Sequence, residues 1–479
     1  MYFKKIFWTV AALLLLAGCG GTRATTATEP EFKSISTEAV TTEDTNLYAT
    51  LSGIDPAPAD RVALAAAIEG LDLASLPTVP NFPRRTYGIG ETATFWTHNG
   101  DTLEFKQITA RLMAKSKFAY FWQDVDLVAL NGQGEPVTAA DWAEVGASFD
   151  STYEKVRAVF GFEESPGLDG DPRLFVINSD ALGNVGGYFG QNDLLPALVE
   201  PHSNQGQYFF MSNTGTGGVN SEYYKEVLAH EFQHMIQKNV DANEEGWMNE
   251  GLSMLAQQVA GMRGDNWVSE YLVKPDQSLW FWSSESSDYG QSYLYLDYIY
   301  EQLGEDFMKA VVADPRNGLA SIDAIAQSLG SDRGADALYV DSMTAAFFNN
   351  PNLGSGQFAY KVPVIPTLAP RYEFAGLPAT YEGAVQQYGG FDVMTFSGEG
   401  PASGRGDACD ACLVEQLIGG GERVEEVGLL EDEADLSSAY LSSASWVERG
   451  DIGVPDLDPS MVGCAQGAGD REERGLPRT

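Results

Sequence analysis

The chain has 479 residues, of which 44% are hydrophobic, and it is therefore long enough to bury a sizeable core in more than one domain. Its formal net charge of −39, from 68 acidic and 29 basic residues, leaves no basic patch that could bind nucleic acid. We therefore expect no nucleic-acid partner, and we interpret the acidity as a well-solvated surface.

The first residues have the pattern of a bacterial export signal. Two lysines precede an apolar run over residues 6–16, and the run ends at Leu-Ala-Gly-Cys19, which resembles the lipobox of bacterial lipoproteins. The run is too short to span a bilayer comfortably, which argues against a transmembrane anchor. We expect residues 1–19 to be a lipoprotein signal peptide, with the lipid carried on Cys19. Because Gly20 rather than Asp follows the cysteine, the predicted location is extracytoplasmic, at the outer membrane or cell surface, with membrane contact only through the lipid.

Composition divides the rest of the chain into five segments. Residues 20–46 are rich in Thr, Ala, Ser and Glu and should form a flexible tether. Residues 47–135 contain short β-prone runs between polar turns and are predicted to be a β-rich N-terminal module. Residues 136–364 carry the strongest patterns and are predicted to be the main domain. Residues 365–402 look like the start of a C-terminal β-module, and residues 403–479 are an acidic tail, either disordered or the product of a frame error in the gene, to which we assign no function.

The main domain alternates helical and extended patterns. Thr138-Ala-Ala-Asp141 has the form of a capping box and precedes apolar residues at helical spacing. The apolar runs 173–177 and 207–211 have strand length and are predicted to lie in one sheet. Farther along, helical periodicity dominates in the runs 293–299, 307–312, 322–329 and 338–348. These patterns predict an α+β fold with a mainly helical second lobe.

One motif within this domain has the spacing of metal ligands. Residues 227–236 read Val-Leu-Ala-His230-Glu231-Phe-Gln-His234-Met-Ile, and their apolar character predicts a buried helix. Residues four apart lie on one face of a helix, so both imidazoles can bind a single ion. Zinc accepts neutral imidazole nitrogens, and a catalytic zinc site keeps three protein ligands and an open position for water. We therefore predict that His230 and His234 bind one zinc ion, and that Glu231 is the general base that activates its water.

The third predicted ligand is Glu250. It is the central carboxylate of an apolar helical pattern over residues 247–256, Trp-Met-Asn-Glu-Gly-Leu-Ser-Met-Leu-Ala. An ionised carboxylate is costly to bury in such a segment unless a cation compensates its charge. Glu244 and Glu245 are the rival carboxylates, but they lie in a polar stretch that looks like the connecting loop. We therefore favour Glu250 over both.

His-Glu-Phe-Gln-His-Met-Ile followed by Trp-Met-Asn-Glu-Gly-Leu-Ser resembles the gluzincins, in particular the hyicolysin-type peptidases. The resemblance extends more weakly over residues 140–350. It implies a zinc metallopeptidase, a hydrolase acting on a protein or peptide substrate. It also implies a fold in which residues 136–364 form a two-lobed catalytic domain, with a mixed sheet and the motif helix in one lobe, a mainly helical second lobe, and a substrate cleft between them.

The sequence departs from this family in two ways. Only 15 residues (235–249) separate His234 from Glu250, fewer than in the thermolysin and aminopeptidase N branches, so the connecting loop should be short. The Gly-x-Met-Glu-Asn stretch by which the aminopeptidases hold a free amine is absent from the sequence. Endopeptidase action is therefore favoured over aminopeptidase action. A catalytically inactive binding or adhesion lipoprotein on the same fold is the other alternative, and the retention of Glu231 argues against it.

Further candidates are less specific. Tyr289, in Asp-Tyr-Gly at the start of a predicted helix, resembles the gluzincin tyrosine that stabilises the oxyanion, although a core aromatic or Tyr293 would fit the same pattern. The glycine-rich residues 184–190 are either an edge strand for an extended substrate or an ordinary turn and strand. His98 and His202 lack metal-spaced partners, and we interpret both as structural.

Overall fold

The computed structural model describes residues 60–72 and residues 86–362 except 332. It also describes residues 365, 366 and 368 and the backbone of seven strands between residues 372 and 448. The predicted signal peptide with Cys19 and the predicted tether lie outside these residues. The described part begins with helix α2 (Arg61–Glu69). None of the helices in these ranges is both long enough and apolar enough to cross a membrane.

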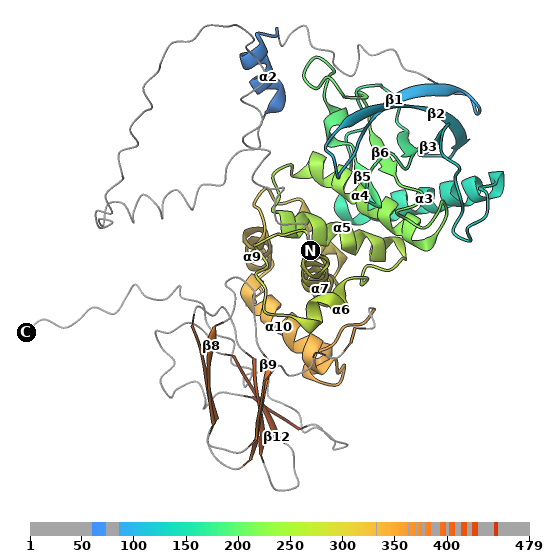
Figure 1. The fold of residues 1–479 in the computed structure, drawn as a ribbon. Helices are drawn as coiled ribbons and strands as arrows, with labels where there is room; N and C mark the ends of the chain where they lie inside the picture. Colours follow the sequence, from blue (N-terminus) through green and yellow to red (C-terminus); the bar gives the residue numbers. More distant parts are fainter. Residues whose placement is uncertain are drawn as a thin grey trace, which may run out of the picture. The chain divides into compact units, whose positions relative to one another are not determined.

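A mixed six-stranded sheet forms the first layer of the fold (Figure 1). Its strands are β1 (Thr92–His98), β2 (Phe105–Lys115), β3 (Ala119–Asp124), β4 (Leu174–Asn178), β5 (Gly187–Phe189) and β6 (Tyr208–Met211). Their spatial order is β1-β2-β3-β4-β6-β5. The central strands β3, β4 and β6 are parallel, whereas β2 and β1 on one side and β5 on the other run antiparallel to their neighbours. β5 is therefore an edge strand.

The β-prone runs of the predicted N-terminal module belong to this same sheet. β3 pairs with β4 in parallel, with Ala119 opposite Leu174 and Gln123 opposite Asn178. The boundary that the sequence suggested at residue 135 therefore falls within one sheet. β3 is buried along nearly its whole length, as a central parallel strand must be, but its residues carry no information about which strand it pairs with.

Two helices pack against one face of the sheet. Helix α3 (Ala139–Phe160) begins at the predicted capping box, in which the Thr138 backbone N–H donates to Asp141 Oδ2 at 2.7 Å. Helix α4 (Glu222–Val240) is capped by Ser221, whose Oγ accepts a hydrogen bond from the Tyr224 backbone N–H at 2.9 Å. Phe149 of α3 and Phe232 of α4 meet edge-on, with ring centroids 5.7 Å apart, in the core that also buries Phe121 and Phe209 of the sheet. This packing fixes α4 against the sheet.

The second lobe is helical, as predicted. It consists of α5 (Gly246–Ala260), α6 (Val268–Val273), α7 (Ser286–Leu303), α8 (Glu305–Val312), α9 (Leu319–Ser328) and α10 (Ala335–Phe348). Helix α5 packs against both α4 and α7, so one continuous core joins the two lobes. The predicted fold class, a two-lobed α+β domain with a mixed sheet and a mainly helical second lobe, is confirmed.

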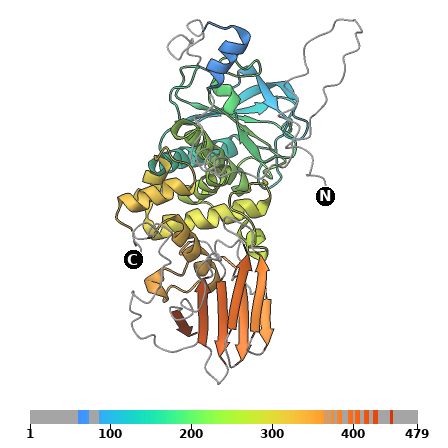
Figure 2. The same cartoon turned by 90° about the vertical axis from the view of Figure 1, so that its left-hand side faces the viewer.

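The C-terminal strands form sheets of their own (Figure 2, orange to red). A five-stranded sheet has the order β13-β12-β11-β9-β7, and β10 pairs with β8. The bounds are β7 (Tyr372–Ala375), β8 (Ala379–Ala384), β9 (Val393–Gly398), β10 (Ala402–Asp407), β11 (Leu413–Ile418), β12 (Val424–Leu429) and β13 (Ser445–Glu448). The sequence boundary at residue 402 thus falls within β10, and strands continue into the residues assigned to the acidic tail. The average composition of that segment obscured its short apolar runs.

Candidate active site

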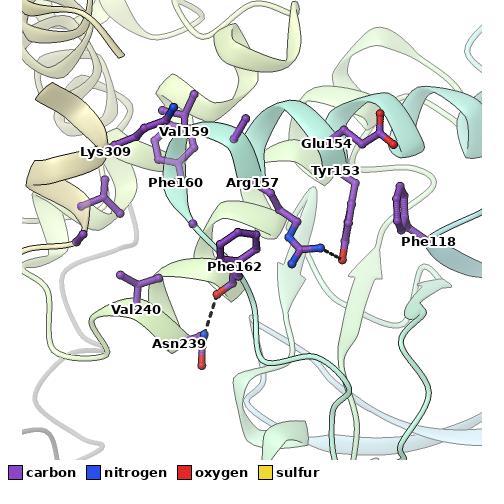
Figure 3. Close-up of a pocket in the computed structure, with 14 residues that line it drawn as sticks. Phe118, Tyr153, Glu154, Arg157, Val159, Phe160, Phe162, Asn239, Val240 and Lys309 are labelled. Atoms are coloured by element: carbon purple, nitrogen blue, oxygen red, sulfur yellow. Dashed lines mark hydrogen bonds between the residues drawn. The ribbon is translucent and has the colours of Figure 1, made fainter. Parts of the chain in front are cut away.

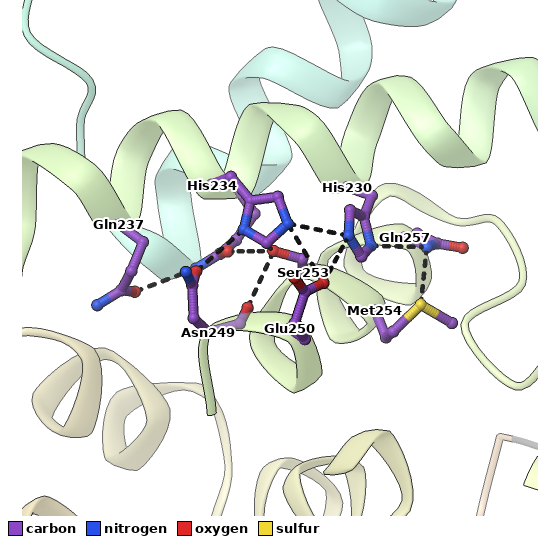
Figure 4. Close-up of polar contacts among 9 residues, drawn as sticks. His230, His234, Gln237, Asn249, Glu250, Ser253, Met254 and Gln257 are labelled. Carbon is purple, nitrogen blue, oxygen red and sulfur yellow. Dashed lines mark hydrogen bonds and ion pairs between the residues drawn. The ribbon is translucent and has the colours of Figure 1, made fainter. Parts of the chain in front are cut away.

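Helices α4 and α5 bring the three predicted metal ligands together (Figure 4). His230 Nε2 lies 3.0 Å from His234 Nε2. Glu250 Oε2 lies 3.1 Å from His230 Nε2 and 3.4 Å from His234 Nε2. One ligand atom from each residue lies within 4.8 Å of the others, and in the described part of the chain this is the one such group of His, Cys, Asp or Glu side chains.

The backbone around Glu250 explains how α5 reaches this position. Residues 241–245 alone connect α4 to α5, so the connection is short, as predicted. The next residue, Gly251, lies against α7, where a Cβ atom would come within 2.9 Å of Ser292 Cβ and 2.8 Å of Leu296 Cδ1. A side chain at Gly251 would push α5 away from α7 and would move Glu250 with it.

In the ligand cluster, the negative charge of Glu250 and positive charge on the histidines stabilise each other. The side chains of His230, His234 and Glu250 are 12%, 15% and 22% exposed, so water screens them weakly. Burial alone would raise the pKa of Glu250, but the two histidines outweigh it and hold that pKa well below its usual range. Burial opposes protonation of His234, yet the charge of Glu250 outweighs it and raises the pKa to about 9. The site therefore favours positive charge between the three side chains.

This donor set fits zinc. Two imidazole nitrogens and one carboxylate oxygen point at a common position, which is the ligand combination that zinc uses in catalytic sites. His230, His234 and Glu250 are therefore the residues that would hold the ion. The prediction of one zinc site per chain agrees with the described residues.

Polar residues of α5 that the sequence analysis missed support both histidines (Figure 4). His234 Nδ1 lies 3.0 Å from Asn249 Oδ1 and 3.0 Å from Ser253 Oγ. His230 Nδ1 lies 3.3 Å from Gln257 Nε2. Asn249, Ser253 and Gln257 are spaced four apart on a largely apolar helix, and this polar stripe beside Glu250 is the signal that could have revealed them.

The cluster opens into a pocket of about 380 Å³ between β5, α4 and the start of α7. Glu231 lines this pocket and is 8% exposed. Tyr289 also lines it, and its ring centroid is 6.3 Å from that of His230. Burial, and then the charges of Glu250 and Glu231, raise the pKa of Tyr289, so its hydroxyl remains a hydrogen-bond donor. The rival Tyr293 is buried, and its hydroxyl donates to Gln258 instead.

The remaining sequence candidates are not part of the ligand cluster and have partners elsewhere. Glu244 Oε1 accepts a hydrogen bond from the Gly318 backbone N–H at 2.8 Å, so it holds a loop although it also lines the pocket. Glu245 Oε2 accepts from Trp247 Nε1 at 2.5 Å. His98 and His202 both pack on Phe105, with ring centroids at 5.1 Å and 4.1 Å. These contacts agree with the structural interpretation of both histidines.

A larger hollow of about 700 Å³ lies elsewhere, between the ends of α3, α4 and α8 (Figure 3). Most of its lining residues are apolar, and two of its polar side chains form hydrogen bonds: Arg157 Nη1 donates to Tyr153 Oη at 2.5 Å, and Asn239 Nδ2 donates to the Phe162 carbonyl at 2.7 Å. None of the candidate catalytic side chains faces this hollow. The smaller pocket is therefore the candidate active site.

The fold is a two-lobed α+β domain, and its smaller pocket brings together a His-Glu-x-x-His helix and a glutamate, a donor set that could hold a catalytic zinc ion. No family model matches the chain. In sequence the chain is similar to the neutral metalloprotease ShpI of Staphylococcus hyicus, with 26% identity over an alignment of 257 residues; the match covers 48% of this chain and 56% of the relative. The chain thus spans little more than half of the relative's length.

The chain also has structural neighbours among solved proteins. It is similar to the M1 zinc metallopeptidase from Deinococcus radiodurans, at 11% identity and a TM-score of 0.33. It is also similar to a two-domain M1 zinc metallopeptidase mutant bound to L-tryptophan, at 12% identity and a TM-score of 0.33. Each match covers 58% of this chain and 63% of the other.

Proposed function

We propose that the chain is a zinc-dependent endopeptidase that hydrolyses peptide bonds in extracellular proteins or peptides. The observation that carries this proposal is the convergence of His230, His234 and Glu250 in one pocket that Glu231 and Tyr289 also line. The similarity to the neutral metalloprotease ShpI supports it.

The residues of the pocket divide the chemistry among them. A zinc ion held by the three ligands would supply Lewis acidity, which lowers the pKa of water and polarises a peptide carbonyl. Glu231 follows His230 directly on α4, and its carboxylate lies in the pocket where it can take a proton from the attacking water. The same carboxyl group can then deliver that proton to the leaving amine. Tyr289, on α7, lines the same pocket, and its hydroxyl can donate to the carbonyl oxygen as negative charge develops there.

The edge strand β5 supplies a surface for an extended substrate. Gly187, Tyr188 and Phe189 line the pocket, and β5 pairs with β6 along its other side. Peptides commonly bind by adding a strand to such an edge, because the backbone hydrogen bonds do not depend on side-chain identity. An internal segment of a substrate chain could lie along β5 past the ligand cluster, which supports endopeptidase over aminopeptidase action.

A cleavage assay combined with metal analysis tests the proposal. We expect about one zinc per purified chain, hydrolysis of casein or gelatin that a chelator abolishes and added zinc restores, and cleavage of N-terminally acetylated peptides at internal bonds. Mass-spectrometric mapping of a peptide library would give the cleaved bonds. A folded chain without zinc, or with zinc but without any hydrolysis, would contradict the proposal. Release of single residues only from peptides with a free amine would instead indicate an aminopeptidase.

Tyr289→Phe should lower kcat more than it raises KM. The substitution removes only the hydroxyl, and a donor to the developing oxyanion acts mainly in the transition state. By comparison with other oxyanion donors, we expect a loss of roughly 10²–10³-fold in kcat. Steady-state kinetics on one internally quenched peptide would measure both constants. Tyr293→Phe is the matched control, because that hydroxyl contacts Gln258 and not the pocket; a larger loss in the control would move the role to Tyr293.

The sequence also supports a proposal for the location of the enzyme. The charged and apolar start of the chain and its lipobox-like ending at Cys19 favour export, removal of the signal peptide and lipid attachment. The enzyme would then act outside the cytoplasm, tethered to the outer membrane or cell surface. The mass of the native N-terminal peptide tests this, since an unmodified Cys19 would exclude the lipid.

A further inference from the structure

The Nδ1 atoms of His230 and His234 contact neutral side chains. Among the described residues, the partners of their Nδ1 atoms are the side chains of Asn249, Ser253 and Gln257. None of these carries a charge. Metal-binding histidines usually donate their second N–H to a carboxylate, a backbone carbonyl or water, which fixes the ring and makes it a stronger ligand. The question is therefore whether these neutral side chains can do the same.

The geometry determines which atom must be an acceptor. The nitrogens that face Glu250 are both Nε2, so a bound metal would leave the proton of each ring on Nδ1. For His234 the arrangement already suits that state, because Asn249 Oδ1 lies 3.0 Å from Nδ1 and can accept. Asn249 precedes Glu250 directly, so one turn of α5 both supplies a ligand and orients another.

For His230 the neighbouring amide is oriented the other way, with its donor end toward the ring. The side-chain atom that contacts its Nδ1 is Gln257 Nε2, a donor, at 3.3 Å. The other end of the same amide, Gln257 Oε1, is buried and has no hydrogen-bond partner. Gln257 itself is only 4% exposed. A buried carbonyl oxygen without a partner costs free energy, on the order of 1–3 kcal/mol. The oxygen and nitrogen ends of an amide are nearly identical in shape and exchange by a rotation of the terminal torsion.

We infer that Gln257 is a positioning residue for His230: with zinc bound, its amide is turned so that Oε1 accepts the Nδ1–H of the ring. The inference rests on the proposed zinc site. The turn gives the unpartnered oxygen a donor and gives the imidazole N–H an acceptor. The turn moves Gln257 Nε2 to the position that the oxygen now occupies, away from Met254 Sδ at 3.2 Å, and a thioether is a weak acceptor. Glu250 is then the sole anionic group contributed by the ligands and their direct partners.

Zinc affinity of the full-length chain tests this role, measured by competition with a chromophoric chelator. Gln257→Leu keeps the approximate size of the side chain but offers no acceptor, and we expect zinc to bind about 10–100-fold more weakly. Gln257→Glu restores an acceptor and should bind zinc at least as tightly as the wild type. Gln258→Leu is the matched control, because the neighbouring amide donates to Asp297 at 2.6 Å and does not contact a histidine. Its zinc affinity should be unchanged.

A spectroscopic measurement separates positioning from general stability. The chain contains only 4 histidines, so ¹⁵N-histidine labelling gives few imidazole signals. We expect a slowly exchanging Nδ1–H of His230 in the zinc-loaded wild type and its loss in Gln257→Leu. If Gln257→Leu bound zinc as tightly as the wild type and kept this signal, the inference would be wrong while the proposed function stood. If Gln257→Glu lost affinity as severely as Gln257→Leu, the acceptor role would also be wrong. If the wild type bound no zinc, the proposed function itself would fail.

Discussion

Glu231→Gln should abolish most hydrolysis and leave zinc in place. The substitution preserves the size of a side chain that is 8% exposed and leaves His230, His234 and Glu250 untouched, so the ligand cluster should stay intact. The pocket loses its proton acceptor, and general acid–base groups typically contribute about 10²–10⁴-fold to a rate. Zinc content and peptide turnover, measured on the same preparation, check the two expectations.

Glu226→Gln is the matched control for this variant. Glu226 is a carboxylate on the same helix, 6% exposed, and its Oε2 accepts a hydrogen bond from Asn266 Nδ2 at 2.9 Å, away from the pocket lining. It should retain both zinc and activity. The assigned role would be wrong if Glu231→Gln still cleaved peptides at the wild-type rate, or if it lost its zinc.

Glu250→Gln should instead lose zinc and activity together. An amide in place of the carboxylate removes the one anionic ligand, and it leaves the two imidazoles without the charge that raises the pKa of His234. We expect the zinc dissociation constant to rise by more than the roughly 10–100-fold that follows loss of a residue supporting a ligand. Chelator competition on the purified variant measures this constant.

Glu244→Gln provides the comparison for Glu250, because Glu244 lines the same pocket but is directed at the Gly318 backbone. Burial raises its pKa to about 7, so near neutral pH only part of the Glu244 population carries a charge that the neutral amide would remove. Zinc should remain bound in this variant. The opposite pattern, with zinc lost from Glu244→Gln and kept by Glu250→Gln, would show that we chose the wrong carboxylate.

The ligand cluster was predictable because its determinants are local. Two histidines four apart on an apolar helix share a face whatever surrounds them, and Glu250 is conspicuous as a carboxylate within a second apolar helix. The short connection over residues 241–245 limits how far apart the two helices can lie. Local pattern and chain connectivity together therefore sufficed to place these three side chains near one another.

Three other features depended on contacts between distant segments: the choice between the two tyrosines, the pairing of β3 and the role of Gln257. The sequence could not decide between Tyr289 and Tyr293, because the choice depends on how α7 is rotated against α5, and that is fixed by packing such as the contact of Gly251 with Ser292. It also could not show that β3 pairs with β4, because any buried apolar strand would satisfy the same pattern. Gln257 escaped notice because a glutamine in a helix ordinarily faces solvent.

The close approach of β5 to α4 has a consequence for what the enzyme can cut. At Gly187 an added Cβ atom would lie 2.8 Å from the Phe210 carbonyl oxygen, 3.0 Å from Met211 Sδ and 3.0 Å from Val227 Cγ1, so no side chain fits there. The close packing of β5 against α4 thus requires a residue without a side chain at position 187. Under the proposed function, a substrate segment could add to the free edge of β5 only as a single extended strand, because strand addition requires an extended backbone, whereas a helix or a hairpin could not pair there. Susceptibility of a target protein would then depend less on its residue sequence than on how readily a segment of it can unfold locally.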